Sequence, residues 1–292
     1  MKKIISLILL MCMVLSFAAY ADESAAPEIT MQEIYEANLT EALLKNHESV
    51  YVQDEADGEI WSERYLTKEY AYEHFYDEDF DYAELMMDDA RYVYSSGDRL
   101  LYLFITPDGV GDFASEREER YASALAADIV DETIEFVSKK DGRITVASVL
   151  SSKNLEALAE SSVTAGKFEY VLDAKSREMI SIISDCTYDD GSALNAITEM
   201  TYDAEVPEML KEFLEYENQT ENLRNVTVVS NPGAEKEESK SIQAPKGLII
   251  GFEFDDAFEG KAGFYTDAAC TEDYDPFADI DSDLTIYVKW TE

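Results

Sequence analysis

Histidine, the side chain that most often carries acid–base chemistry, is almost absent from this sequence. The chain has 292 residues and two histidines, His47 and His74, so a Ser-His-Asp or Cys-His site would have to use one of them. Gly-x-Ser-x-Gly, His-Glu-x-x-His and glycine-rich phosphate loops do not occur in it. Its 63 acidic residues make any carboxylate pair chosen for glycoside hydrolysis uninformative. The sequence therefore predicts a protein that is not an enzyme.

Two acidic segments resemble calcium-binding loops and then depart from the pattern. In residues 279–283 aspartates alternate, but Leu284 stands where the sharp turn needs glycine, and Trp290 stands where the bidentate glutamate belongs. In residues 76–81 the glycine position is taken by Tyr82. We interpret both as solvated acidic loops, and we predict neither a metal site nor a cofactor.

A stripe of tyrosines is the one feature that suggests a binding site. Alternation along a predicted strand at 69–76 places every second side chain on one face, and a strand at 91–94 could lie beside it. Tyrosine combines apolar area with a hydroxyl group, which suits a mixed hydrophobic site. The alternative is that these rings simply pack under helices. The predicted ligand-binding residues are Tyr70, Tyr72, Tyr76, Tyr92 and Tyr94, with His74 on the face of the first three.

The elements that must position this stripe begin with a helix. Thr30 and Glu33 form a capping-box pattern, and apolar residues follow at helical spacing to about Lys45. From Ser49 the period becomes two, and an Asp57-Gly58 turn separates successive strands. Further strands are predicted at 60–66, 69–76, 91–94, 100–105, 133–138, 143–150, 168–172, 179–186 and 192–202, and further helices at 115–129, 154–160 and 207–216.

This order of elements predicts an α+β fold with one large, curved antiparallel β-sheet and a few covering helices. After a polar segment at 217–222 we expect a strand at 226–229, a charged loop at 231–246, a strand at 247–254 and a closing hairpin from Phe264 to Trp290. We therefore place a domain boundary near residue 220. The predicted parts are a signal peptide (1–21), an acidic lead-in (22–29), a curved-sheet domain (30–219) and a small β module (222–292).

The start of the chain predicts export. Lys2 and Lys3 precede an apolar run that ends at Ala19-Tyr20-Ala21, the pattern of a cleaved secretory signal, and no later run is long enough to span a bilayer. The protein is thus expected to be secreted or at the cell surface. Cys186 and Cys270 remain after cleavage, and the sequence leaves open whether they pair.

The net charge of −40 excludes some partners. So acidic a surface repels phosphate backbones and anionic lipid headgroups, which argues against nucleic acid and against electrostatic membrane binding. The same charge keeps an exported protein soluble.

The C-terminal segment resembles a Listeria-Bacteroides repeat, also called an internalin-type B repeat. The resemblance covers about residues 224–290 and rests on Asn225-Val226-Thr227-Val228-Val229, Asn231-Pro232-Gly233, Phe264-Tyr265-Thr266-Asp267 and the strand from Asp283 to Trp290. Gly263-Phe264 replaces the usual Gly-Trp, and Asn231-Pro232-Gly233 replaces Asn-Gly-Gly. The resemblance implies a small β-grasp-like module that acts as a spacer or interaction unit.

The larger part is similar to the periplasmic outer-membrane lipoprotein carriers. The residues that carry this resemblance are 168–175 (Phe-Glu-Tyr-Val-Leu-Asp-Ala-Lys) and 202–208 (Tyr-Asp-Ala-Glu-Val-Pro-Glu), after an N-terminal helix that leads into a strand meander. The resemblance implies an open half-barrel whose concave face, covered by helices, holds acyl chains.

Together these patterns predict an exported, non-enzymatic binding protein that holds an apolar or amphipathic ligand on the concave face of the large sheet. The alternative is a cell-surface interaction or scaffold protein with a filled core. An extracellular hydrolase would need His47 or His74 beside a serine or an acid pair in a pocket. The predicted partners are therefore a hydrophobic small molecule or a cell-surface protein.

Overall fold

The computed structural model divides into two compact units, and each is described by itself. Unit 1 comprises Met1–Leu43, Glu55–Gly58 and Ser123–Met200, and unit 2 comprises Leu44–Asp54, Glu59–Ala122 and Thr201–Glu292. The residues that the structure describes are 28–76, 82–88, 90–95, 100–105, 113–125, 127–158, 162–217, 223–233, 237–252, 262–275 and 277–290. The predicted signal peptide, most of the acidic lead-in and the acidic loop at 77–81 lie outside them.

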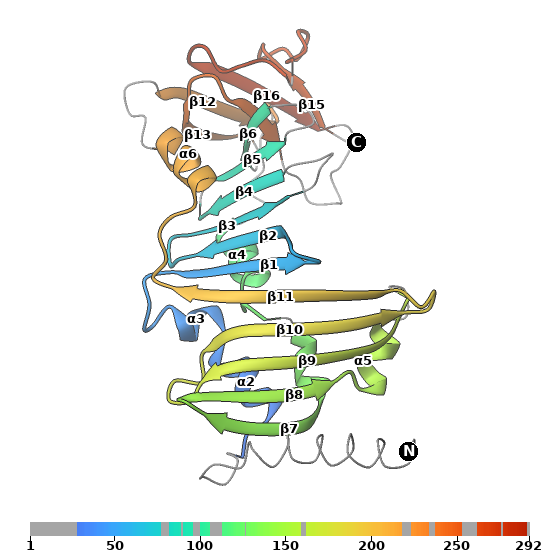
Figure 1. The fold of residues 1–292 in the computed structure, drawn as a ribbon. Helices are drawn as coiled ribbons and strands as arrows, with labels where there is room; N and C mark the ends of the chain where they lie inside the picture. Colours follow the sequence, from blue (N-terminus) through green and yellow to red (C-terminus); the bar gives the residue numbers. More distant parts are fainter. Residues whose placement is uncertain are drawn as a thin grey trace, which may run out of the picture. The chain divides into compact units, whose positions relative to one another are not determined.

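Unit 1 is built on an antiparallel sheet with the strand order β11-β10-β9-β8-β7 (Figure 1). Each strand pairs with its neighbour in sequence, which is the predicted meander. The β7–β8 turn has Asp141 and Gly142 at φ of 49° and 76°, the left-handed pair that suits a tight hairpin. The strands are β7 (Thr133–Lys140), β8 (Arg143–Val149), β9 (Val163–Asp173), β10 (Met179–Tyr188) and β11 (Ala193–Tyr202).

The predicted N-terminal helix is split in two. The helix α2 (Met31–Ala37) starts with the expected capping box between Thr30 and Glu33. It ends at Asn38, whose side-chain amide donates to the Ile34 carbonyl at 2.8 Å, and α3 (Thr40–Leu43) follows. The Asn38 side-chain oxygen also accepts from the Met179 backbone N–H at 2.8 Å, which ties the end of α2 to β10. The backbone of Asn38 leaves the helical range (φ −112°, ψ 15°), so α2 ends there and does not continue to Lys45.

In the described residues of unit 1, two further helical elements are short. They are α5 (Ser152–Ala157) and the 3₁₀ helix η1 (Ala127–Asp131). The helix predicted over 115–129 is accordingly wrong in extent, because the structure has α4 (Phe113–Arg120) in unit 2 and then η1. One face of the unit 1 sheet is buried, with Val146, Tyr170 and Leu172 at its centre. On the other face Ile183 and Ile197 pair directly and stay exposed.

Unit 2 contains a larger sheet in the order β14-β6-β5-β4-β3-β2-β1. Its neighbours from β2 to β6 pair antiparallel, whereas β14 runs parallel to β6. The strand β4 was not predicted. The strands are β1 (Val50–Ala56), β2 (Glu59–Leu66), β3 (Tyr70–Phe75), β4 (Tyr82–Met87), β5 (Arg91–Ser95), β6 (Leu100–Ile105) and β14 (Ile249–Phe252), of which β1, like β11, contributes residues to both units.

The second sheet of unit 2 has four strands in the order β13-β12-β16-β15. Strand β15 (Ala262–Tyr265) pairs antiparallel with β16 (Leu284–Trp290), as expected for the closing hairpin, and β12 (Leu223–Ser230) runs parallel to β16. The charged loop predicted at 231–246 is wrong in part, because β13 (Glu238–Pro245) pairs with β12 along its whole length. The sequence of β13 is mostly polar because its first four residues, 238–241, face solvent.

The core of unit 2 lies between the two sheets. Buried residues of β2–β6 contact buried residues of β12, β16 and the helix α6 (Glu208–Glu217) in one hydrophobic cluster. Strand β14 falls within the predicted C-terminal module but pairs with β6 of the larger sheet. The α+β class with a curved antiparallel sheet, few helices and a small C-terminal sheet is confirmed. The boundary near residue 220 stays a prediction.

Candidate functional site

The predicted tyrosines lie mostly on one face of the larger sheet in unit 2. Tyr72 pairs with Leu85, and Leu85 pairs with Tyr92, so the two rings flank one leucine in a single cross-strand row. This row continues to Tyr65 on one side and to Leu103 on the other. Tyr72 is 0% exposed and Tyr92 is 1% exposed. The alternation seen in the sequence therefore places these side chains on a common face.

That face is packed rather than open at Tyr72 and Tyr92. The ring of Phe213 from α6 lies 6.2 Å from Tyr72 and 6.4 Å from Tyr92 between ring centroids. Tyr70 and Tyr94 are half-buried against the same cluster. Because Phe213 covers the centre of the row, this part of the stripe forms the core of unit 2.

Tyr76 differs from the other four tyrosines. It follows the end of β3, its side chain is 41% exposed, and its ring centroid lies 4.0 Å from that of His74. Of the predicted site residues, the structure thus brings Tyr70, Tyr72, Tyr92 and Tyr94 into one core and leaves Tyr76 at its margin.

A buried carboxylate, Glu63, organises the polar groups on the tyrosine face. It accepts from the Tyr51 hydroxyl at 2.7 Å and from the Tyr72 hydroxyl at 3.5 Å, and His74 Nδ1 lies 3.6 Å from it. Burial by itself raises the pKa of Glu63, but the hydrogen bonds from His74, Tyr51 and Tyr76 outweigh it and lower that pKa. Glu63 is therefore held as a carboxylate that orients the surrounding rings.

A cavity of about 330 Å³ lies at the Tyr92 end of the row. One wall comes from β5, β6 and the residue before β5, and the other comes from the start of β12 and from β13. Its volume is at the lower end of the range typical of ligand pockets. The described lining residues are Ala90, Tyr92, Leu103, Leu223, Ser241, Ile242 and Gln243.

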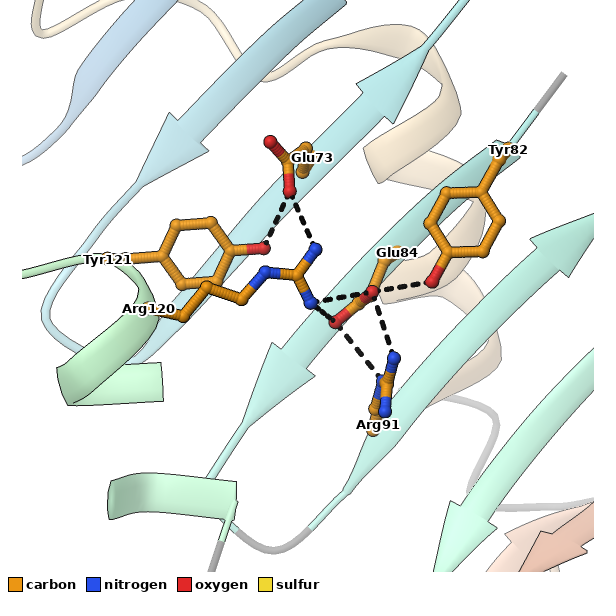
Figure 2. Close-up of polar contacts among 6 residues, drawn as sticks. All are labelled: Glu73, Tyr82, Glu84, Arg91, Arg120 and Tyr121. Atoms are coloured by element: carbon orange, nitrogen blue, oxygen red, sulfur yellow. Dashed lines mark hydrogen bonds and ion pairs between the residues drawn. The ribbon is translucent and has the colours of Figure 1, made fainter. Parts of the chain in front are cut away.

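On the opposite face of β3–β5 lies a cluster of charged side chains (Figure 2). Its centre is Glu84, whose side chain is 0% exposed. Glu84 accepts from Arg120 at 2.9 and 3.1 Å, from the Tyr82 hydroxyl at 2.6 Å, and it pairs with Arg91 at 3.1 Å. Arg120 also donates to Glu73 at 2.9 Å, so one guanidinium bridges carboxylates on two neighbouring strands.

The cluster fastens the end of α4 to the sheet. Arg120 is the last residue of α4, and Tyr121, which follows it, donates to Glu73 at 3.2 Å. Burial raises the pKa of Tyr121, and the charges of Glu73 and Glu84 raise it further. Burial, with the bond to Glu84, also raises the pKa of Tyr82 to about 12. Both phenols are thus held neutral at neutral pH, and the carboxylates and guanidinium groups neutralise one another. This arrangement suits a structural clamp rather than proton transfer to a substrate.

This cluster was not predicted from the sequence. Glu73 lies on a predicted strand, but Glu84 lies on β4, which was not predicted. The signal was present in the apolar residues Ala83, Leu85 and Met87, which alternate along this segment.

His47 and the two cysteines lie apart from the tyrosine face and from the charged cluster. His47 Nδ1 lies 3.1 Å from Asp203, and its ring stacks on Tyr202 at 4.5 Å. Cys186 and Cys270 are free thiols, and burial raises the pKa of the Cys186 thiol, as does Asp185.

Within the described ranges there is no group of three or more His, Cys, Asp or Glu side chains placed to hold a metal ion. In that same part of the chain no helix is long and apolar enough to cross a membrane.

Comparison with known proteins adds only weak likenesses. No family model matches the chain, and no curated protein matches its sequence. The Mycobacterium tuberculosis lipoprotein LppX is similar with a TM-score of 0.35 and 10% identity, over 61% of this chain and 96% of LppX. MucB in complex with periplasmic MucA gives a TM-score of 0.25 and 14% identity, over 62% of this chain and 58% of that one.

The Pseudomonas aeruginosa MucA/MucB complex gives a TM-score of 0.24 and 15% identity, over 62% and 59%. Likenesses of this strength carry no argument about what the chain binds. The resemblance of residues 224–290 to the Listeria-Bacteroides repeat stays a prediction.

Proposed function

We propose that this protein is an exported, non-enzymatic binding protein that holds an apolar or amphipathic group in the cavity beside Tyr92. The observation that carries the proposal is the lining of that cavity. Tyr92, Leu103 and Ile242 supply apolar surface, while Ser241 and Gln243 supply uncharged polar groups. The surface that the walls present to the cavity is more polar than apolar, so a group that carries polar as well as apolar atoms suits it.

The proposal narrows the site that the tyrosine stripe suggested. Phe213 of α6 packs on Tyr72 and Tyr92 from the side of the small sheet, so a ligand would not lie along the whole stripe. Tyr92 alone among the five tyrosines is a described lining residue of the cavity. We thus expect the ligand in a short pocket at one end of the row, rather than along the whole concave face.

A dye-binding experiment tests this function. Mature protein would be titrated with Nile red, a neutral apolar dye, and its denatured extract would be analysed by mass spectrometry. We expect saturable dye binding that Ala90→Phe and Leu223→Trp weaken at least tenfold, because both substitutions fill the cavity. Ala193→Phe, a matched change at an exposed position of β11, should leave binding unchanged. Absence of saturable binding, or equal binding by Ala90→Phe in a protein with unchanged circular dichroism, would contradict the proposal.

A second candidate is a surface-interaction protein whose tyrosine face serves only as core. The packing of Phe213 on the stripe favours it, as does the exposure of Ile60 (45%) and Trp61 (44%) at the start of β2. Under this candidate Ile60→Ser with Trp61→Ser would abolish partner binding, and Ala90→Phe would not affect it.

A further inference from the structure

We infer that the outer face of the unit 1 sheet is the contact surface of a homodimer, in which two copies of this chain pack sheet against sheet. The outer face is the side of β7–β11 that carries Ile183 and Ile197. It belongs to unit 1, whereas the Tyr92 cavity is lined by residues of unit 2. The inference therefore goes beyond the proposed function and does not depend on it.

Strand pairing determines which side chains share the outer face. Directly paired residues of neighbouring antiparallel strands point to the same side of a sheet, as does every second residue along a strand. One row of partners crosses all five strands from β7 to β11, and it consists of Phe136, Ala147, Glu169, Ile183 and Ile197. The rows beside it are Ser138, Thr145, Val171, Ser181 and Glu199, and Thr133, Val149, Lys167, Asp185 and Asn195.

The rest of the chain leaves this face uncovered. Every residue in these three rows is exposed or half-buried, and Phe136, Ile183 and Ile197 are 49%, 45% and 38% exposed. A solvated face of an antiparallel sheet normally carries polar residues. Here two apolar groups flank Glu169, with Phe136 and Ala147 on one side and the two isoleucines on the other. Apolar side chains gathered on an exposed face indicate an interaction surface.

Charge favours a second copy as the occupant. The chain has 63 acidic residues against 23 lysines and arginines, but the outer face is nearly balanced. Lys167 lies opposite Asp185, and Arg143 lies opposite Asp173, so opposite charges neighbour each other on it. Its charged residues in these rows and the adjoining one are Lys140, Arg143 and Lys167, and Glu169, Asp173, Asp185 and Glu199.

A nearly neutral face can meet a copy of itself with little repulsion, whereas the acidic remainder of the surface cannot. A cationic partner would instead be drawn to that acidic remainder. In a two-fold symmetric dimer the same patch on both copies forms the contact, so it must suit itself. The outer face meets this condition because its apolar residues are accompanied by both signs of charge.

The size of the face also suits a dimer. Five strands about 4.8 Å apart, carrying rows about 6.7 Å apart, give a face of about 24 Å by 30 Å, or about 700 Å². Two copies would together bury about 1,400 Å², which lies within the roughly 1,200–2,000 Å² of stable interfaces. The alanine, serine and threonine residues between the larger side chains allow two sheets to approach to the usual distance of about 10 Å.

Sedimentation velocity of the full mature chain tests the inference. Reducing buffer is needed because Cys186 and Cys270 are free thiols, and a disulfide between copies would imitate a dimer. Interfaces of this size have dissociation constants from about micromolar downward, so concentrations would run from well below to well above about 1 μM. We expect a reversible monomer–dimer equilibrium that added salt strengthens, because salt screens the repulsion between two acidic copies. A monomer throughout, or a dimer that salt dissociates, would overturn the inference.

Substitutions locate the contact. Ile183→Thr with Ile197→Thr, and separately Phe136→Thr, should each weaken dimerisation at least tenfold. These side chains are exposed in the single copy and threonine favours strands, so each variant should keep the circular dichroism of the parent. Phe277→Thr is the matched control, because Phe277 is 67% exposed and lies in unit 2. An undiminished dimer in the isoleucine variant, or equal weakening by Phe277→Thr, would overturn the inference.

A charge change tests the same surface without removing apolar area. Lys167→Glu should also weaken dimerisation at least tenfold, because it adds negative charge to both copies and places two acids opposite each other at Asp185. Lys211→Glu makes the same change on α6 of unit 2 and should have a smaller effect, which high salt removes. Equal effects of the two changes would mean that net charge alone controls association, and the outer face would not be the contact.

Discussion

Single side chains in unit 2 show how a buried charge is held. Glu84 is fully buried and meets two guanidinium groups and one phenol. Removing one partner of a buried ion pair typically costs about 3–5 kcal/mol, because the remaining charge is left uncompensated. Here Arg91 remains after the loss of Arg120, so the cost should fall below that range.

We predict that Arg120→Met lowers the free energy of unfolding by about 2 kcal/mol. Lys211→Met is the matched control, because it removes an exposed ion pair with Glu208 and should change stability by less than about 0.5 kcal/mol. Urea denaturation at neutral pH measures both effects. Equal stability of Arg120→Met and the parent protein would show that Glu84 is not held by this contact.

Because several tyrosine side chains are buried, we predict that the folded protein loses stability at alkaline pH. Burial, with the bond to Glu84, raises the pKa of Tyr82 from 10.0 to about 12, and burial raises the pKa of Tyr51 and Tyr121 as well. A folded-state pKa above the unfolded value stabilises the fold fully below pH 10, and this contribution is lost as the pH rises through the folded pKa. Thermal melting between pH 9 and about 12 should therefore show a falling midpoint. Tyr82→Phe should reduce the slope, and a flat profile would contradict the expectation.

The tyrosine stripe could be predicted from the sequence only in part. Alternation correctly placed Tyr72 and Tyr92 on one face, since a period of two is a property of the backbone. It could not indicate that Phe213, more than a hundred residues later, would cover them. That contact depends on where α6 packs, and nothing local to the stripe records it.

Among the elements, those with strong local signals were predicted best. The capping box at Thr30 and the Asp141-Gly142 turn each dictate a backbone conformation over a few residues. Strands β4 and β13 were missed for different reasons. The first is a short strand that follows an acidic segment, and the second is an outer strand whose exposed residues are polar. An edge strand needs few apolar residues, so its pattern is weak.

The side chain of Asn38 joins α2 to β10, so we predict that its replacement by alanine lowers the stability of the fold. Its side-chain amide donates to the Ile34 carbonyl, and its oxygen accepts from the Met179 N–H. Asn38→Ala would leave the Met179 N–H buried without this partner, at a cost of about 1–3 kcal/mol. Thr30→Ala, which removes only the exposed N-cap of the same helix, should cost about 1 kcal/mol. Urea denaturation would compare them, and a smaller loss for Asn38→Ala would contradict the assigned role.

For the whole molecule, the division into two compact units has a measurable consequence. Asn38 and Met179 belong to unit 1, whereas Glu84 and Arg120 belong to unit 2. Local opening free energies differ between cooperative parts of a protein. If each compact unit opens as one such part, a destabilising change should act mainly on the unit that contains it.

Hydrogen exchange measured by mass spectrometry would test this at the scale of the chain. We predict that Asn38→Ala speeds exchange in β9 and β10 and leaves β3–β5 nearly unchanged, because its lost hydrogen bonds lie within unit 1. Arg120→Met should do the reverse, since its lost contacts join α4 to β3 and β4. Equal acceleration in both units by either variant would mean that the chain unfolds as one cooperative body. A ligand in the Tyr92 cavity should then slow exchange throughout the chain, whereas under our prediction it protects unit 2 alone.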